Sequence, residues 1–266
     1  MIIVGELINS SRKAIGEAVD KKDAQYIQQV ALEQAKAGAD YIDVNCGNKV
    51  FEELSNMEWL VNTIQEVVEK PLCIDSPNPA ALEVGLNLCK FGQPMINSIN
   101  DEGHRFDDVL PLVLKYQAKI VALCMDDKGM PETAADRMRV TDNLYRKLTS
   151  AGVKDDDIYF DPLVKPISSV GTAGLEVLET IRLIKQNYPQ THFMCGLSNI
   201  SYGLPERKVL NRLFVAQTMA VGMDGYILNP NDKSMMGVIH AAKALLGQDD
   251  YCMGFLTAYR QGFYEK

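Results

Sequence analysis

Apolar residues follow two alternating patterns along the chain. Short runs rich in β-branched residues occur eight times, and between them lie stretches whose apolar residues recur at intervals of three and four positions, such as Ile27, Val30 and Ala31. The first pattern is typical of a buried strand and the second of an amphipathic helix. The eight predicted strands are residues 1–6, 40–46, 71–76, 94–100, 119–125, 158–162, 191–198 and 224–230.

Glycines punctuate this alternation at a recurring place. The segments KAGADYID, SAGVKDDDIYFD and AVGMDGYIL each place a glycine where a helix would end in a left-handed cap, just before the next strand. Eight such β/α units fit a closed (β/α)8 TIM barrel, one domain over residues 1–266, better than an open doubly wound sheet. No G-x-G-x-x-G segment follows the first strand, which further weakens a dinucleotide-binding fold.

Polar side chains stand at the ends of the predicted strands. The segment PLCIDSPNP, residues 71–79, is an apolar strand that ends in Asp75, ahead of two prolines. In a β/α barrel the carboxyl ends of the strands converge and carry the chemistry. These ends form a predicted ring of carboxylates and amides: Glu6, Asp43, Asn45, Asp75, Asn97, Asn100, Asp126, Asp161, Asn199 and Asn229.

The charge of the chain narrows its partners. Lysine and arginine number 27 against 35 aspartates and glutamates, a formal net charge of −8, and no basic run occurs. This argues against binding to nucleic acid or to an anionic membrane surface. The apolar start, MIIV, is too short for a signal peptide, and no window approaches 18 unbroken apolar residues. We therefore expect a cytoplasmic protein that binds small molecules or proteins.

Cysteine and histidine give little support for a metal site. The six cysteines form no C-x-x-C pair, and four of them, Cys46, Cys73, Cys124 and Cys195, lie in or at the end of strand-like runs. Buried reduced thiols are therefore expected rather than metal ligands or disulfides. The three histidines are isolated and far from any cysteine at ligand spacing. No bound metal is predicted.

Converging Asp and Asn side chains suit one kind of ligand in particular. Carboxylates accept hydrogen bonds and amides both donate and accept, so together they match a flat heterocycle with N–H, amino and carbonyl edges, such as a pterin. Each charge-assisted bond of this kind contributes about 1.5–3 kcal/mol. The competing use of such carboxylates is to bind a divalent cation such as Mg²⁺.

Eight motifs occur along the chain in a recognisable order and spacing. They are GELIN (5–9), GADYIDVNCG (38–47), MEWL (57–60), PLCIDS (71–76), MINSIND (95–101), DPL (161–163), GLSNIS (196–201) and LNR (210–212). Together they resemble the pterin-binding barrel family. The nearest branch is the methyltetrahydrofolate:corrinoid methyltransferases, a branch that includes the folate domain of cobalamin-dependent methionine synthase; dihydropteroate synthase is more distant. The resemblance covers essentially the whole chain, and its combination of motifs is specific.

The resemblance implies roles for the residues that recognise the pterin ring. Asp75, Asn97 and Asp161 match the positions that hydrogen-bond the pterin in that family. Asn199 matches the residue near the methylated nitrogen, and it is the one predicted catalytic residue. In the implied reaction Asn199 donates a hydrogen bond to the departing nitrogen, and this bond stabilises the transition state more than the ground state.

The resemblance also implies the rest of the pocket. Gly196 and Ser198 correspond to the backbone and loop of one pocket wall. Arg207 corresponds to an arginine near the folate tail, which suits a ligand that carries glutamate carboxylates. At Tyr202 this chain departs from the glutamine expected there, so the basis for recognising the tail differs from the family pattern.

The implied substrates are 5-methyltetrahydrofolate, or tetrahydrofolate, and a corrinoid (cobalamin) whose cobalt accepts or donates the methyl group in either direction. No D-x-H-x-x-G cobalamin signature is present, because DEGHRF at residue 101 has the wrong spacing. The corrinoid is therefore expected on a separate corrinoid protein or free in solution. The resemblance further implies a homodimer.

Each assigned residue also has a simpler structural interpretation. Asp75 or Asp161 could cap the helix that follows, as aspartate often does. Asn97 could be a turn residue and Asn199 a helix or loop cap. Arg207 could be an ordinary solvated charge.

Other functions have weaker support in the sequence. A dihydropteroate synthase would need a diphosphate site near the eighth strand, where this chain reads ILNPNDKS without an R-x-H pair. Lys165 invites a Schiff-base aldolase, yet it lies four residues beyond Asp161 and outside the apolar strand that would desolvate it. A non-catalytic subunit that binds folate or docks a corrinoid protein is the alternative from another class.

Overall fold

Eight parallel strands form the centre of the computed structural model, which describes residues 1–264. Neighbouring strands follow the order β7-β6-β5-β4-β3-β2-β1-β8. The ring closes between its two ends, where Gly196 and Ile227 form a parallel bridge and the Ile227 amide donates to the Cys195 carbonyl at 3.0 Å. The predicted (β/α)8 barrel is confirmed. The strands are β1 (Ile2–Gly5), β2 (Tyr41–Asn45), β3 (Leu72–Asp75), β4 (Met95–Asp101), β5 (Lys119–Asp126), β6 (Ile158–Asp161), β7 (His192–Phe193) and β8 (Gly225–Leu228).

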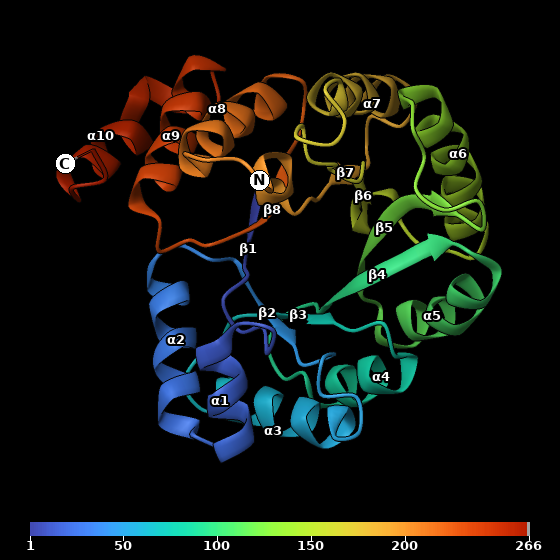
Figure 1. Ribbon diagram of the computed structural model, residues 1–266, viewed down its shortest axis with the longest axis vertical. Coiled ribbons are helices and arrows are strands. Elements are labelled where there is room, and N and C mark those ends of the chain that lie inside the picture. The colour runs from blue at the N-terminus through green and yellow to red at the C-terminus, as the bar shows by residue number, and fades with distance from the viewer. Residues whose placement is uncertain (265–266) are drawn as a thin grey trace.

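Helices surround the strands on the outside (Figure 1). Two of them follow β1, where one was predicted, and one further helix, α10, follows the last β/α unit. The helices are α1 (Lys13–Lys21), α2 (Ala24–Lys36), α3 (Glu53–Gln65), α4 (Pro79–Leu88), α5 (Gly103–Tyr116), α6 (Ala134–Ser150), α7 (Ala173–Asn187), α8 (Arg207–Ala220), α9 (Lys233–Leu245) and α10 (Met253–Arg260). Short 3₁₀ helices lie at η1 (Asp155–Asp157), η2 (Leu197–Ser201) and η3 (Asp250–Cys252).

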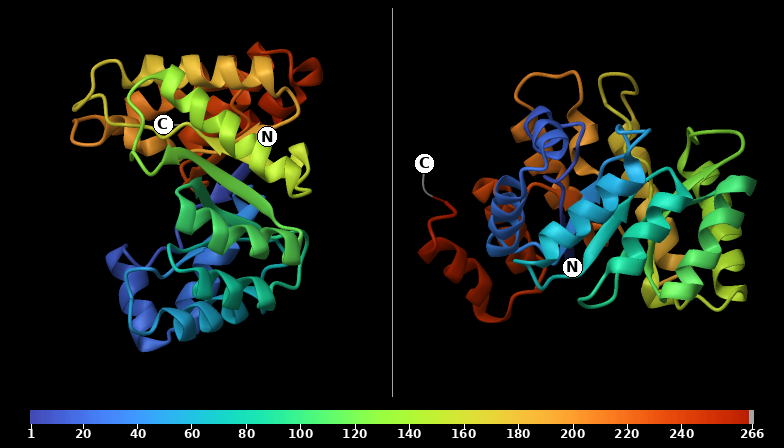
Figure 2. Two further views of the ribbon diagram at one scale, coloured as in Figure 1. Left: turned by 90° about the vertical axis from the view of Figure 1, so that its right-hand side faces the viewer. Right: turned by 90° about the horizontal axis from the view of Figure 1, so that it is seen from below.

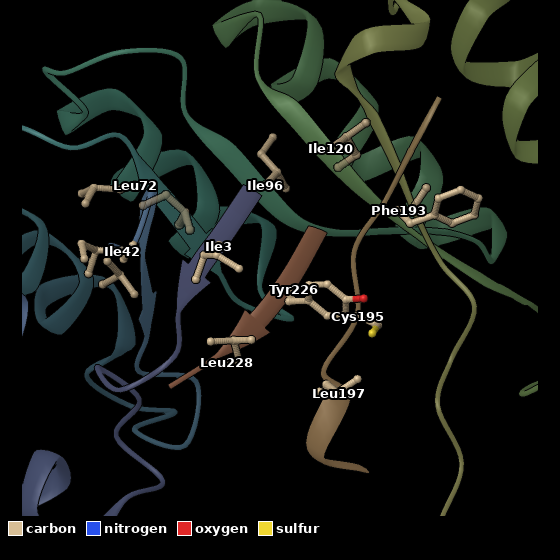
Figure 3. Close-up of a cluster of buried hydrophobic side chains, with 14 of the residues drawn as sticks. Ile3, Ile42, Leu72, Ile96, Ile120, Phe193, Cys195, Leu197, Tyr226 and Leu228 are labelled. Atoms are coloured by element: carbon tan, nitrogen blue, oxygen red, sulfur yellow. The ribbon is translucent and has the colours of Figure 1, made fainter. Parts of the chain in front are cut away.

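Alternation along each strand sends side chains to two separate cores. Ile3, Ile42, Leu72, Ile96 and Ile120, each from a different strand, belong to the larger core between strands and helices (Figure 3). A smaller core fills the inside of the barrel with Val4, Tyr41, Cys73, Met95, Val121, Tyr159 and Met194. Because successive side chains of a strand point to opposite faces, the residue two positions beyond each of these also faces the barrel interior.

Glycines lie in left-handed conformations at the helix ends where the sequence predicted them. Gly38, Gly152 and Gly222 have φ of +100°, +98° and +112°, a left-handed conformation that favours glycine. The helix α4 begins at Pro79, and its cap is Asn78, whose side chain accepts from the Ala80 amide at 3.1 Å. Proline at the first helical position has no amide hydrogen to leave unpaired.

The seventh strand is shorter than predicted. Residues 191–198 were expected to form it, but regular pairing covers only His192–Phe193. The Met194 amide still donates to the Phe160 carbonyl at 3.0 Å, after which the chain turns into η2. The motif GLSNIS therefore forms a loop with a 3₁₀ turn at the barrel mouth instead of a strand end.

Loops after the strands gather at one end of the barrel. In the right-hand view of Figure 2 the yellow β6–α7 loop and the orange β7–α8 loop project from the same end. These are the loops that follow Asp161 and that carry Asn199.

None of the helices within residues 1–264 has the length and apolar character of a membrane-spanning segment.

Candidate active site

Three predicted pterin-binding residues reach the same end of the barrel interior. Asp75, Asn97 and Asp161 lie two positions beyond Cys73, Met95 and Tyr159, which fill the interior core. Asp75 is also paired in register with Asn97 on the next strand. The strand order and the alternation of side chains thus bring these three polar groups together above an apolar floor.

Asp75 presents a carboxylate that is only partly satisfied by the protein. Its Oδ2 accepts from the Asn45 side-chain nitrogen at 2.7 Å, across the β2–β3 pair. Burial raises the pKa of Asp75 to about 6, against the lowering effects of the Asn45 bond and the nearby Arg105. Since Asn78 caps α4, the interpretation of Asp75 as the helix cap is wrong. Among the described residues only Asn45 donates to this carboxylate, which leaves Oδ1 as a possible acceptor for a ligand.

The pKa of Asp161 is raised more than that of Asp75. Burial raises its pKa to about 7, although the Leu163 amide donates to its Oδ1 at 2.8 Å and Arg137 also lowers the pKa. That bond closes a short turn after β6, whereas α7 begins only at Ala173. Asp161 is thus not a helix cap, and a buried carboxyl whose pKa lies near neutrality at the end of a barrel strand is a candidate for function.

Asn97 lies where β4 becomes irregular. The pairing between β4 and β5 shifts register between Asn97 and Ile99, so the strand bends at this position. Such bulges re-aim side chains and are common next to active sites. Asn97 lies within β4, half-buried, which rules out the interpretation that it is a turn residue.

The η2 loop carries the remaining predicted residues. Asn199 is exposed, and its side-chain nitrogen lies close to Gly196. Arg207 donates to the Ser198 carbonyl at 2.8 Å and lies 5.9 Å from the Tyr202 ring centre. Arg207 therefore holds this loop in shape, and its role toward a folate tail stays a prediction.

A small cavity borders this loop. Its volume is about 90 Å³, and its lining includes Glu6 after β1, Ser198 from η2 and Asn229 after β8. The space is too small for a bicyclic ligand and suits a few water molecules, each of which occupies about 30 Å³ in the liquid.

Other members of the predicted ring stabilise loops. Asn100 donates to Glu102 at 2.8 Å, and Asn229 accepts from the Asn231 amide at 2.9 Å. Asp126 forms an ion pair with Arg139 at 2.8 Å. These three side chains have partners within the protein, and Glu6 likewise pairs with Arg12. The members of the predicted ring that remain candidates are Asp43, Asn45, Asp75, Asn97, Asp161 and Asn199.

Arg105 is a site residue that the sequence analysis missed. From the first turn of α5 its guanidinium donates to the carbonyls of Ser76, Pro77 and Ser98 at 2.6–2.9 Å. It ties the loop after Asp75 to the bend of β4. No local pattern pairs an arginine at 105 with carbonyls as far as 29 positions away.

Replacing Arg105 with lysine is expected to lower the stability of the fold. One ammonium cannot reach three carbonyls, and each lost bond from a charged donor costs about 1.5–3 kcal/mol. We expect the free energy of unfolding in urea to fall by about 2–3 kcal/mol. Arg146→Lys, at an exposed arginine of α6 that bonds to Asn143, is the matched control and should unfold like the wild type. Equal stability of both variants would show that Arg105 does not hold the site together.

The His, Cys, Asp and Glu side chains of residues 1–264 were candidates for metal ligation, and the cysteines for thiol chemistry. No group of three or more His, Cys, Asp or Glu side chains there is arranged to hold a metal ion. Each of the six cysteines is free, and the four predicted to be buried are buried. Burial raises the pKa of Cys46 and Cys124 to about 12, so these thiols are unreactive near neutrality.

Two comparisons relate the whole chain to known sequences. The family model described as "Pterin binding enzyme" matches residues 5–229. The chain is 38% identical to Methylcorrinoid:tetrahydrofolate methyltransferase of Eubacterium limosum over 265 residues, which cover 98% of this chain and 97% of the relative. It is 29% identical to Methionine synthase of Mycobacterium tuberculosis over 258 residues, which cover 92% of this chain but 21% of that larger protein.

Known structures share the barrel. The crystal structure of 7,8-dihydropteroate synthase from Vibrio fischeri ES114 matches with a TM-score of 0.71 and 15% identity over 93% of each chain. Dihydropteroate synthase from Xanthomonas albilineans in complex with 7,8-dihydropteroate matches with a TM-score of 0.64 and 16% identity over 92% of each chain. At these identities the two structures support the fold alone. The resemblance seen in the motifs is confirmed by the family model and by the sequence relatives: the chain belongs to the pterin binding enzyme family.

Proposed function

We propose that this protein is a methyltransferase that moves a methyl group between 5-methyltetrahydrofolate and the cobalt of a corrinoid, in either direction. The observation that carries the proposal is the set of side chains left for a ligand at one end of the barrel: Asp75, Asn97 and Asp161. The 38% identity to a Methylcorrinoid:tetrahydrofolate methyltransferase over nearly the full length of both chains supports the same reaction.

Recognition of the pterin depends on charge-assisted hydrogen bonds. Asp75 and Asp161 accept from the ring N–H and amino groups, while the Asn97 amide both accepts and donates. The low-polarity floor beneath them strengthens each bond, because water competes less for the same groups.

Asn199 assists the departure of the methyl group. The bond from the methyl carbon to N5 breaks as a bond from that carbon to cobalt forms. N5 keeps the electron pair and gains a proton that arrives through water or a neighbouring acid, while Asn199 donates a hydrogen bond. A donor that bonds N5 more strongly as this pair develops lowers the barrier. The exposed position of Asn199 on the η2 loop leaves its amide free to turn toward a bound folate.

The corrinoid enters as the second substrate. We infer that it is delivered by a separate corrinoid protein, or binds free, at the open end of the barrel where the η2 loop lies. A homodimer and a cytoplasmic location belong to the same proposal. Light scattering of the purified protein and fractionation of the source cells test these two points.

The activity is tested by mixing the protein with 5-methyltetrahydrofolate and reduced cobalamin under anaerobic conditions. We expect the cob(I)alamin absorbance to decay and that of methylcobalamin to appear at a rate proportional to enzyme concentration. A protein that binds the folate tightly without forming methylcobalamin, with free cobalamin or with a corrinoid protein, would be the non-catalytic subunit. A protein that does not bind the folate would contradict the assignment of the pocket.

A further inference from the structure

Asp43 is a carboxyl group buried in the barrel interior next to the proposed pterin site. It lies on β2 between Tyr41, which belongs to the interior core, and Asn45, which bonds Asp75. Only 2% of Asp43 is exposed, and its Oδ1 has no hydrogen-bond partner. In the β2–β3 pairing Asp43 stands opposite Cys73, two residues before the Asn45–Asp75 pair and therefore on the same face of the sheet.

The groups that act on Asp43 are acidic or neutral. They are Asp75 and Cys73 on β3 and Glu6, the residue after β1. The nearby cations serve other groups, because Arg12 pairs with Glu6 at 2.7 Å and Arg105 binds backbone carbonyls. An unpaired anion in such surroundings is strongly disfavoured and takes up a proton instead. Burial and the neighbouring Asp75 accordingly raise the pKa of Asp43 well above its usual range.

Asp75 has the opposite surroundings. It accepts a hydrogen bond from Asn45 at 2.7 Å, and the charge of Arg105 also favours its ionised form. Two neighbouring carboxyl groups with such different partners divide their protons unequally, so the first to ionise is the one with the better donors.

We propose that Asp43 and Asp75 hold one proton between them, carried by Asp43, so that Asp75 alone presents an anionic carboxylate to the pteridine. Asp43 is then a positioning residue that acts through Asp75. Because Asp43 stays neutral, the pair Asp43 and Asp75 carries a single negative charge. One negative charge suits a neutral pteridine edge that presents N–H and amino donors. The part of this inference that concerns the pteridine rests on the proposed function, whereas the location of the proton does not.

Infrared difference spectra of the protein without any folate test where the proton lies. At pH 7.5 the wild type minus Asp43→Asn spectrum should show the carbonyl-stretch band of a protonated carboxylic acid. The wild type minus Asp75→Asn spectrum should show instead a carboxylate band, which the variant lacks. If Asp43→Asn does not fold, Asp43→Ser serves for the same subtraction. The proposal is overturned if the protonated-acid band is absent from the wild type minus Asp43→Asn difference or present in the wild type minus Asp75→Asn difference, because the contribution of Asp161 cancels in both differences.

The pH dependence of folate binding provides a second readout, because it reports which of the two carboxyl groups gains the proton as the pH falls. Asparagine is neutral like the proposed acid, so Asp43→Asn should bind 5-methyltetrahydrofolate within about threefold of the wild type. It should also keep the loss of affinity near pH 6 that the Asp75 pKa of about 6 implies. Asp75→Asn should lose that step. Disappearance of the step in Asp43→Asn would place the titrating proton on Asp43 and contradict the inference. If the wild type binds no folate, the proposed function fails, and the infrared spectra still decide where the proton lies.

Discussion

Replacing Asn199 with alanine is expected to lower the rate of methyl transfer about 10²-fold, with little change in the affinity for 5-methyltetrahydrofolate. Asn199 is exposed on the η2 loop, so its loss leaves no cavity and no buried group without a partner. Its proposed hydrogen bond to N5 strengthens only as the carbon–nitrogen bond breaks, and such a bond contributes to turnover rather than to ground-state binding. Single-turnover formation of methylcobalamin and fluorescence titration of the folate measure the two effects separately.

Asn187→Ala is the matched control for this experiment. Asn187 is an exposed asparagine at the end of α7, and its amide donates to the Leu183 carbonyl at 2.8 Å. This variant should transfer methyl groups at the wild-type rate. Equal losses of rate and affinity in Asn199→Ala would assign Asn199 to ground-state binding, and no loss of either would remove it from the site.

The barrel could be predicted because its signals are local. Each strand is a short apolar run, and glycines such as Gly38 and Gly152 mark left-handed helix ends that few other residues adopt. The errors arose where tertiary contacts replace a regular ladder. Residues 194–198 read as strand, but Met194 and Cys195 bond to different neighbouring strands and the chain turns at Gly196.

The site could be predicted only in part for the same reason. Strand-end positions follow from the pattern and the barrel, so Asp75 and Asp161 were found as candidates. Which polar residues have partners depends on contacts distant in sequence, such as Asn45 to Asp75, 30 positions apart. Arg105 and the isolated oxygen of Asp43 likewise become visible only when the strands lie side by side.

Asp161→Asn is expected to weaken the binding of 5-methyltetrahydrofolate about 10- to 100-fold, because the amide removes one charge-assisted acceptor worth about 1.5–3 kcal/mol. It should also change the pH dependence of binding. With a pKa of about 7, Asp161 is an anion above neutrality and gains a proton below it. The wild type should therefore lose affinity as the pH falls from 8 to 6, whereas the variant should lack this step and keep only the step near pH 6 from Asp75.

The same substitution should stabilise the fold at high pH. The native pKa of about 7 exceeds the ordinary aspartate value of about 3.9. Between these two pH values the folded protein therefore binds more protons than the unfolded chain, and the free energy of unfolding falls as the pH rises. Above pH 7 this difference amounts to about 4 kcal/mol at most, at 1.36 kcal/mol per pKa unit. Asparagine has no charge to desolvate and can keep the bond from Leu163. The variant should therefore melt at a higher temperature than the wild type at pH 8 and lose this advantage toward pH 4.

Asp127→Asn, at an exposed aspartate after β5, is the matched control and should change neither folate binding nor the melting temperature. If the wild type and Asp161→Asn melt at the same temperature at pH 8, the ionised Asp161 does not destabilise the fold, and the prediction is wrong.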